Sequence, residues 1–342
     1  AAVNAIKSGQ NQYPPGIGVP ELRHAVADHQ QRFWGLEFDP DTEVLITAGA
    51  TEALAGALLG TLEPGDEVVV FEPMYDSYQA CIALSGAKVV PVLLRPTPDG
   101  YRFDENELKA AIGPQTRSIL LNTPHNPTGK VFTREEITFI SSLAIEHDLM
   151  VITDEVYEHL IFDGREHVSM AGLPGMRERT LTISSGGKTF NTTGWKIGWI
   201  CGPQELLRAA MSAKQFLTYV NGAPFQPAIA AGLRLGDDYF NRLAASLADT
   251  RDRLGEGLCA AGFDVFPSEA TYFTTVDITP LRSDGDGVAF CTELPRKIGV
   301  VAIPNQVFYV NPEHGRSLVR FACCKRPEVI DEAVERLVTL SA

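Results

Sequence analysis

Short runs of mainly apolar residues, separated by segments of helical periodicity, constrain the fold more than any other feature of this sequence. Such runs occur at Val44–Ile46, Glu67–Phe71, Ser118–Leu121 and Met150–Thr153. A strand that is apolar throughout has both faces covered, which is typical of parallel sheets with helices on either side. The sequence therefore predicts an α/β fold of three layers, with a mostly parallel sheet between two layers of helices.

The pattern changes in the last third of the chain. A long helical region over residues 205–257 is interrupted at 221–224. Beyond it strand-like segments, among them Val300–Ile303, alternate with helices predicted over 288–298 and 328–340. This alternation favours a second, smaller α+β domain. We expect an N-terminal segment (1–12), a large domain (13–225) and a small C-terminal domain with a connecting helix (226–342).

Composition excludes several classes of partner. The chain has 29 basic and 43 acidic residues and a net charge of −14, which disfavours nucleic acid and anionic membranes as ligands. No run approaches the ~18 apolar residues of a membrane span. The six cysteines form no C-x-x-C pair and the seven histidines are scattered, so we predict no metal site and a reducing, cytoplasmic location.

A lysine follows one of the predicted strands. The apolar residues Leu181 and Ile183 lead into Ser184–Lys188, where two glycines precede the lysine. A phosphate-binding P-loop would need a glycine five residues before Gly187, and Thr182 occupies that position. The remaining interpretations are a lysine that forms a Schiff base with a carbonyl cofactor and an ordinary surface lysine.

Asp154 ends another strand, and its chemistry depends on what it meets there. An aspartate at this position could cap the next helix. It also follows a strand whose body should be buried, and a buried carboxylate needs a cation or strong hydrogen-bond donors. The protonated nitrogen of a pyridine ring is such a cation, and the carboxylate would in turn keep that nitrogen protonated.

Polar or aromatic residues also follow three further strands. Asn126 lies in the Pro- and Asn-rich loop Asn122–Gly129, which could be a simple turn or could present an amide to a phenolate oxygen. Tyr75 could stack on a flat ring or pack in the core. Gly49–Thr51 begins a helix, where backbone N–H groups favour a phosphate. Because ligands gather at the carboxyl ends of parallel strands, we expect these residues to meet.

Four of these segments, in this order, carry a specific resemblance: Asn126–Gly129, Asp154–Tyr157, Ser185–Lys188 and Gly194–Trp199. Over essentially its whole length the chain resembles the pyridoxal 5′-phosphate (PLP) dependent aminotransferases of fold type I, class I/II. The likeness is greatest to the actinobacterial N-succinyldiaminopimelate aminotransferases, followed by the kynurenine–glutamine and methionine aminotransferases. It makes the large domain the PLP-binding one.

The resemblance implies a role for each residue near the cofactor ring. Lys188 would form the Schiff base with PLP and then move the proton during catalysis. Asp154 would pair with the pyridine nitrogen, Asn126 and Tyr157 would bond the phenolic oxygen, and Tyr75 would stack on the ring.

It also implies how the phosphate and the substrate are held. Ala50, Thr51, Ser185 and Lys196 would bind the phosphate, together with Tyr13 from the partner subunit of a homodimer. Many relatives have arginine at the position of Lys196. Lysine supplies a single ammonium charge there instead of a planar guanidinium with several fixed donors. Arg320 would bind the substrate α-carboxylate through two parallel hydrogen bonds, with Asn126 beside it. An arginine in a strand as apolar as Leu318–Phe321 needs an anion, which supports this role independently.

The implied reaction moves an amino group between glutamate, or a similar donor, and a 2-oxo acid. N-succinyldiaminopimelate is the favoured substrate, which would place the enzyme in lysine biosynthesis. Alternatives are a kynurenine-, methionine- or glutamine-type aminotransferase, a β-lyase or decarboxylase on the same fold, and an aminotransferase-like regulatory domain. Tyr13, Ile17 and Phe225 could line the distal part of the pocket. The family also has an arm and a helix ahead of residue 1, and the chain begins without methionine, so we expect residues upstream.

Overall fold

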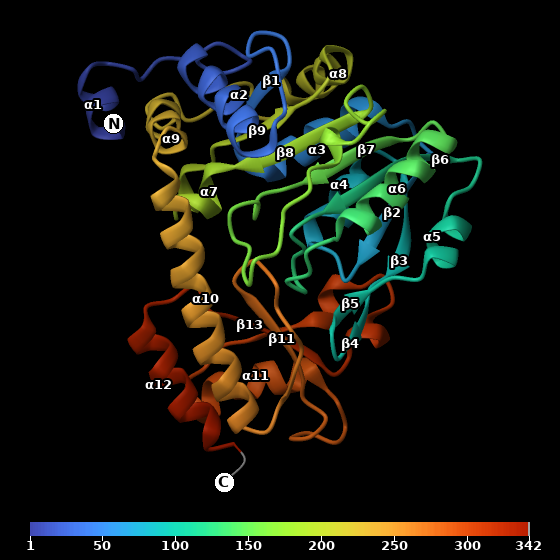
Figure 1. The fold of residues 1–342 in the computed structure, drawn as a ribbon, viewed down its shortest axis with the longest axis vertical. Helices are drawn as coiled ribbons and strands as arrows, with labels where there is room; N and C mark the ends of the chain where they lie inside the picture. Colours follow the sequence, from blue (N-terminus) through green and yellow to red (C-terminus); the bar gives the residue numbers. More distant parts are fainter. Residues whose placement is uncertain (341–342) are drawn as a thin grey trace.

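The computed structural model describes residues 1–340, and within them the larger sheet has seven strands (Figure 1). Their order is β1-β9-β8-β7-β6-β2-β3. The strands are β1 (Val44–Thr47), β2 (Glu67–Glu72), β3 (Lys88–Leu93), β6 (Thr116–Asn122), β7 (Met150–Asp154), β8 (Thr180–Ser185) and β9 (Gly198–Cys201). Strands β8, β7, β6, β2 and β3 are mutually parallel, whereas β9 pairs antiparallel with β8 and β1. The mostly parallel sheet is confirmed.

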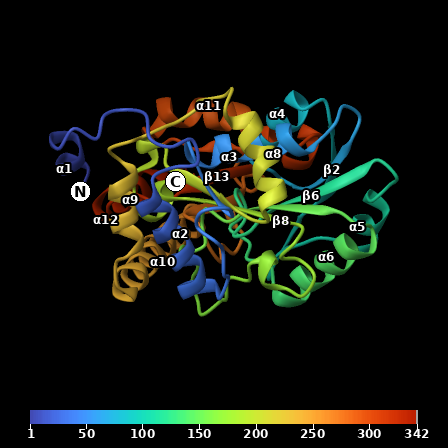
Figure 2. The same ribbon diagram turned by 90° about the horizontal axis from the view of Figure 1, so that it is seen from above.

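Helices cover both faces of this sheet, which explains why its strands are apolar throughout. Val68 and Val70 of β2 pack in the core beneath one helical layer, and Val69 and Phe71 pack in the core on the opposite face. Figure 2 shows α4 (Asp76–Leu84) and α8 (Gln204–Lys214) on one side and α5 (Glu105–Ala111) and α6 (Arg134–Glu146) on the other. The helices α1 (Ala2–Lys7), α2 (Pro20–Trp34) and α9 (Gln226–Leu233) complete the N-terminal side.

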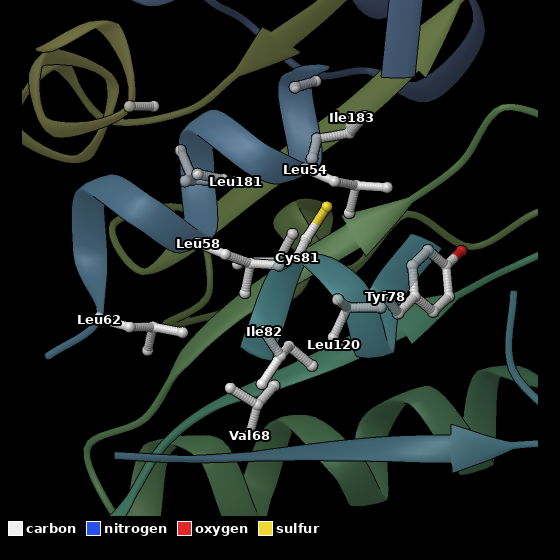
Figure 3. Packing of buried hydrophobic residues seen from close by; sticks show 14 of the residues in the cluster. Leu54, Leu58, Leu62, Val68, Tyr78, Cys81, Ile82, Leu120, Leu181 and Ile183 are labelled. Carbon is white, nitrogen blue, oxygen red and sulfur yellow. The ribbon is translucent and has the colours of Figure 1, made fainter. Parts of the chain in front are cut away.

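The first core cluster also supports the site. Leu54 and Leu58 of α3 (Gly49–Thr61) pack with Ile82 of α4 and Ile183 of β8 (Figure 3). Helix α3 lies so close to α8 that a Cβ on Gly60 would be 2.3 Å from the carbonyl oxygen of Ala209. This close packing fixes the helix whose first turn faces the cavity described below.

The smaller sheet is antiparallel, with strand order β10-β11-β13-β12. Its strands are β10 (Asp264–Val265), β11 (Phe273–Asp277), β12 (Ile303–Pro304) and β13 (Leu318–Ala322). The long helix α10 (Asp237–Ala260) runs from the larger sheet to this one, where α11 (Gly287–Ile298) and α12 (Pro327–Val338) also pack (Figure 1). Within residues 1–340, no helix combines the length and apolar character that crossing a membrane requires.

Local structure departs from expectation in three places. The predicted helical region over 205–257 is three helices, because a second break at 234–236 separates α9 from α10. The hairpin of β4 (Arg95–Thr97) and β5 (Gly100–Arg102), together with α5, was not predicted, since these elements are too short for a clear periodicity. The segment expected as a strand over Val300–Ile303 pairs only at its end, in β12.

Candidate active site

The ends of the strands bring the polar residues together. Asn122 of β6 pairs in register with Asp154 of β7, and Ser185 of β8 pairs with Gly198 of β9. A cavity of about 480 Å³ opens at this edge, between the larger sheet and β13. Ten residues singled out in the sequence line it: Ala50, Thr51, Tyr75, Asn126, Asp154, Tyr157, Ser185, Lys188, Lys196 and Arg320.

Asp154 is a buried carboxylate that faces this cavity. Its side chain accepts hydrogen bonds from Tyr78 Oη at 2.7 Å and from the Val156 N–H at 3.3 Å. The ring of Tyr78 packs in the core while its hydroxyl points away from the cluster (Figure 3). Burial raises the pKa of Asp154 to about 6. Within residues 1–340 no cation lies within ion-pair distance of Asp154, and the more distant charge of Lys188 offsets the effect of burial on its pKa only in part.

A chain of hydrogen bonds leads from Asp154 to the smaller sheet. Asn122 Nδ2 donates to the Asp154 carbonyl at 2.8 Å, and Asn122 Oδ1 accepts from the Asn126 N–H at 2.7 Å. Asn126 Oδ1 in turn accepts from Arg320 Nη1 at 2.7 Å. Asn126 is thereby fixed between Asn122, which bonds the backbone of Asp154, and the arginine.

Lys188 lies in α7 (Gly186–Thr189), directly after β8. Its Nζ donates to Tyr272 Oη at 2.9 Å and lies 5.8 Å from the centre of the Tyr157 ring. The rings of Tyr157 and Tyr272 meet edge to face at 5.5 Å, and burial holds the pKa of Tyr157 well above its ordinary value. The amine is thus half-buried among aromatic rings and directed by one hydroxyl.

Another part of the cavity lining offers groups that favour an anion. The first turn of α3 presents the backbone of Ala50 and Thr51, and Lys196 lies beside Gly49. Lys196 has a left-handed backbone conformation (φ 55°), and its carbonyl accepts from Asn221 Nδ2 at 2.9 Å. Helix N–H groups and an ammonium group together favour a phosphate.

Arg320 lies between two aromatic rings. Its guanidinium carbon is 4.0 Å from the centre of the Phe273 ring and 4.7 Å from that of Phe308. Burial lowers the pKa of Arg320. Since the rings restrict the guanidinium plane and one N–H already bonds Asn126, the remaining donors can face a carboxylate in the cavity.

The sequence profile of aminotransferase class I and II matches residues 1–337. The chain belongs to this family. Aminotransferases of class I and II are PLP-dependent transaminases, and this enzyme is one of them. It is 49% identical to a probable N-succinyldiaminopimelate aminotransferase of Mycobacterium tuberculosis, across 100% of this chain and 88% of that protein.

Two further relatives agree on the fold. The solved structure of N-succinyldiaminopimelate aminotransferase from Mycobacterium tuberculosis superposes with a TM-score of 0.97 at 50% identity, covering 99% of this chain and 88% of the other. The methionine aminotransferase of Escherichia coli is 38% identical over 97% of this chain and 85% of that protein. The prediction of the PLP transferase fold of type I is therefore confirmed, as is the aminotransferase family.

The residues of this aminotransferase fit PLP on structural grounds. The cofactor carries a ring nitrogen that can be protonated and a phosphate. The cavity lining includes Asp154, which has no cation of residues 1–340 within ion-pair distance, and the α3 N-terminus with Lys196. Lys188 of α7 lines the same cavity. The predicted cofactor residues on this chain thus surround one space, with the exception of Tyr13.

Three residues proposed for the pocket lie elsewhere in the single chain. Tyr13 is 80% exposed, and its ring contacts only that of Tyr219 among the ring contacts described for residues 1–340. Phe225 stacks on Trp195 at 5.0 Å, and Ile17 packs against the core. The expected contact of Tyr13 with a neighbouring subunit stays a prediction, because one chain cannot test it.

Sequence reasoning missed several residues that shape the site. Tyr78 lies on α4, three residues after Tyr75, the residue that precedes this helix, and this proximity to Tyr75 could have suggested its role. Tyr272 and the rings of Phe273 and Phe308 come from the smaller domain. No local pattern links those residues to Lys188 or Arg320.

A second polar cluster lies behind the site. His29, Glu158 and His159 are buried and their donor atoms lie within 4.8 Å of one another. The Nε2 atoms of the two histidines are 2.7 Å apart, which is a hydrogen-bond distance and shorter than the ~3.3 Å between two ligands on a tetrahedral zinc ion. Glu158 accepts from Trp34 Nε1 at 2.5 Å and from Ser184 Oγ at 2.6 Å. This is the geometry of a hydrogen-bonded network.

Proposed function

We propose that this aminotransferase moves the amino group of glutamate, or of a similar donor, to a 2-oxo acid with Lys188 as its catalytic base. The observation that carries the proposal is the meeting of three groups on one cavity: the Lys188 amine, the buried Asp154 carboxylate and the guanidinium of Arg320. These are an acid–base group, a partner for a cationic ring and a carboxylate receptor.

We propose that the residues that the family resemblance implies hold the cofactor, and the fact that most of them line one cavity supports this. Asp154 would pair with the ring nitrogen, Asn126 and Tyr157 with the ring oxygen, and Tyr75 would cover the ring. The phosphate would be held by four residues of this chain and one of its partner: Ala50, Thr51, Ser185, Lys196 and Tyr13 of the partner subunit. Bound PLP supplies an electron sink that makes the Cα–H bond of an amino acid breakable.

The chain's own groups then act on the substrate. Arg320 binds the α-carboxylate through two N–H groups, and Asn126 fixes the guanidinium from the side. The Lys188 Nζ removes the proton from Cα, and its hydrogen bond to Tyr272 Oη orients the amine. Burial of the site strengthens each of these interactions.

We further propose a homodimer with shared sites. Tyr13, Phe216, Leu217 and Tyr219 are all exposed apolar or aromatic side chains, and Phe216 is 86% exposed. Exposed aromatic groups of this size favour burial against another surface. If Tyr13 completes the neighbouring site, mixing a Tyr13→Ala subunit with a Lys188→Ala subunit should restore activity through hybrids that contain one intact site. Full activity of a monomer at assay dilution would contradict the proposal.

For the substrate we propose N-succinyldiaminopimelate, with glutamate as its partner. Identity of 49% to the probable mycobacterial enzyme over the whole chain supports it. A methionine- or kynurenine-type specificity is the second candidate, because the wall beside Arg320 is apolar: Ile303, Val307 and Phe308 line the cavity there. Among the lining residues described, the cations are Lys188, Lys196 and Arg320, so a second substrate carboxylate needs a cation from outside this set.

A panel of amino donors and oxo acids separates the two candidates. A site that pairs a second carboxylate rejects analogues without it more strongly than an apolar pocket rejects a change of size. We expect the succinylated substrate to exceed kynurenine and methionine in kcat/KM by at least ~100-fold. Comparable values for all three would overturn the proposed substrate and leave the aminotransferase activity intact.

A further inference from the structure

A buried glutamate ties the edge of the larger sheet to the smaller domain. Glu72 ends β2 and is 3% exposed. Its carboxylate accepts from the Val310 N–H at 2.9 Å and faces His314 Nδ1 at 3.4 Å. Two residues later, the Met74 N–H donates to the Phe308 carbonyl at 2.7 Å. Three polar contacts therefore join the end of one strand to a segment far away in sequence.

The segment that Glu72 holds forms one wall of the active site. It includes η3 (Asn305–Phe308) and η4 (Pro312–Gly315), and η3 contributes Val307 and Phe308 to the cavity lining. The Phe308 ring lies against the guanidinium of Arg320. Val307 is 54% exposed, so its burial contributes little to keeping this segment in place.

The surroundings of Glu72 suit a role in holding this segment. Burying a carboxylate is costly unless hydrogen bonds compensate for lost hydration. Here the donors are one backbone N–H and one imidazole, and both come from the segment 305–315. Removing the carboxylate would leave the Val310 N–H without this acceptor, and the chain that carries Phe308 would be held by the Met74 contact as the one that remains of these three.

We propose that Glu72 is a positioning residue for substrate binding. It fixes the segment 305–315 against the sheet edge, and through Phe308 it keeps the Arg320 guanidinium in the orientation that receives a carboxylate. The inference rests on the proposed role of Arg320. A shift of about 1 Å in a group that binds the substrate can have a large effect on turnover, so the connection is functional as well as structural.

The test measures the segment and the site separately on the PLP-loaded enzyme. Hydrogen exchange followed by mass spectrometry reports on residues 305–315. Calorimetric titration reports the Kd of glutarate, which has the carbon chain of glutamate without its amino group and cannot react. The variants are Glu72→Ala and Glu72→Gln. Glu43→Ala is the matched control, because Glu43 also accepts a backbone N–H and bonds a cationic side chain, Arg177, but precedes β1 at the far end from the site.

We expect Glu72→Ala to speed exchange in residues 305–315 and to raise the glutarate Kd about tenfold, which corresponds to ~1.4 kcal/mol. Glu72→Gln, which keeps an oxygen acceptor for the Val310 N–H, should restore most of the affinity. Glu43→Ala should change neither quantity. If Glu72→Ala does not fold, Glu72→Asp replaces it, because aspartate shortens the side chain by one methylene. Exchange in residues 305–315 and the glutarate Kd should then change in the same direction by a smaller amount.

Three results would overturn the inference: faster exchange with unchanged affinity, no change in exchange, or an equal loss of affinity in Glu43→Ala. The proposed role of Arg320 fails separately. If Arg320→Ala binds glutarate as tightly as the unmodified enzyme does, the carboxylate lies elsewhere, whatever the exchange data say about Glu72.

Discussion

Asp154 and Glu155 are neighbours in the chain and both are buried, yet their carboxylates meet opposite surroundings. Asp154 faces the cavity and has a hydroxyl and an amide as donors. Glu155 points away from it, where it pairs with His167 Nε2 at 2.7 Å and accepts from Ser169 Oγ at 3.0 Å. Burial alone would lower the pKa of His167, but the charge of Glu155 and its hydrogen bond outweigh that, and the pKa is raised.

The difference teaches how to separate chemistry from support in this site. The charge of a buried carboxylate with a cationic partner is compensated within the protein, so removing that carboxylate should lower the stability of the fold. The charge of a buried carboxylate that faces a cavity and has no ion-pair partner is compensated only when a ligand binds. Removing that carboxylate should therefore lower activity. The predictions below test this division.

The largest expected effect is on activity in Asp154→Asn. An amide cannot hold a ring nitrogen protonated, so kcat/KM should fall by about 10³-fold, on the scale of losing a preorganised electrostatic partner. The cofactor-free protein should be at least as stable as before, because an unpaired buried charge is removed. Steady-state kinetics and urea unfolding measure the two quantities. If the activity of Asp154→Asn stayed within tenfold of that of the unmodified enzyme, the functional distinction between Asp154 and Glu155 would be wrong.

Glu155→Gln should show the reverse. Breaking a buried pair by removing one partner costs about 3–5 kcal/mol of unfolding free energy, since His167 loses its counter-charge. Activity of the folded, PLP-loaded fraction should change by less than about tenfold. Replacing both partners by apolar residues, as in Glu155→Met with His167→Leu, should recover much of the stability. A stable Glu155→Gln protein with little activity would place Glu155 in the catalytic group.

The cofactor-free protein should also show the burial of Asp154 as a pH dependence. Its pKa is about 6, against an ordinary value of 3.8. A group with a raised pKa stabilises the fold below its unfolded value, and that contribution is lost as the pH rises from 3.8 through 6. Relative to the unmodified protein, Asp154→Asn should gain about 2 kcal/mol of unfolding free energy between pH 4 and pH 7. A difference that does not vary with pH would contradict the assignment.

The smallest effect is expected in Tyr78→Phe. Its hydroxyl stabilises the charged form of Asp154, so its removal should raise the pKa of Asp154 further and lower kcat/KM about tenfold. The same change in an Asp154→Asn background should have little effect, because the charge it serves is already gone. Equal losses in both backgrounds would show that Tyr78 acts independently of Asp154.

Sequence predicted the layers of the fold because apolar runs report directly which strands are buried. The gathering of Asp154, Asn126 and Ser185 followed from the rule that parallel strands end at one edge. Contacts between domains could not be predicted in this way. The Lys188–Tyr272 contact joins residues 84 apart, and the Val310–Glu72 contact joins residues 238 apart. Hydrophobic periodicity predicts that a side chain is buried, but it does not predict which distant segment packs against it.

For the same reason, the sequence predicted the residues on one side of the cavity better than those on the other. The residues proposed to hold the cofactor lie at the edge of the larger sheet, in motifs that can be recognised in the local sequence. The wall formed by Ile303, Val307 and Phe308 lies on the smaller domain, in a segment whose only strand is two residues long. In the proposed function the substrate side chain meets that wall, and the sequence accordingly identified the cofactor more readily than the substrate.

The central claim is that Lys188 holds PLP in this cavity, and one measurement tests it directly. The purified enzyme is reduced with borohydride, which fixes a Schiff base as a stable amine, and its peptides are mapped by mass spectrometry. The account predicts a pyridoxyl group on Lys188 and none in Lys188→Ala, with loss of turnover by several orders of magnitude in that variant. A pyridoxyl group on Lys196 or another lysine, with Lys188 unmodified, would contradict the account.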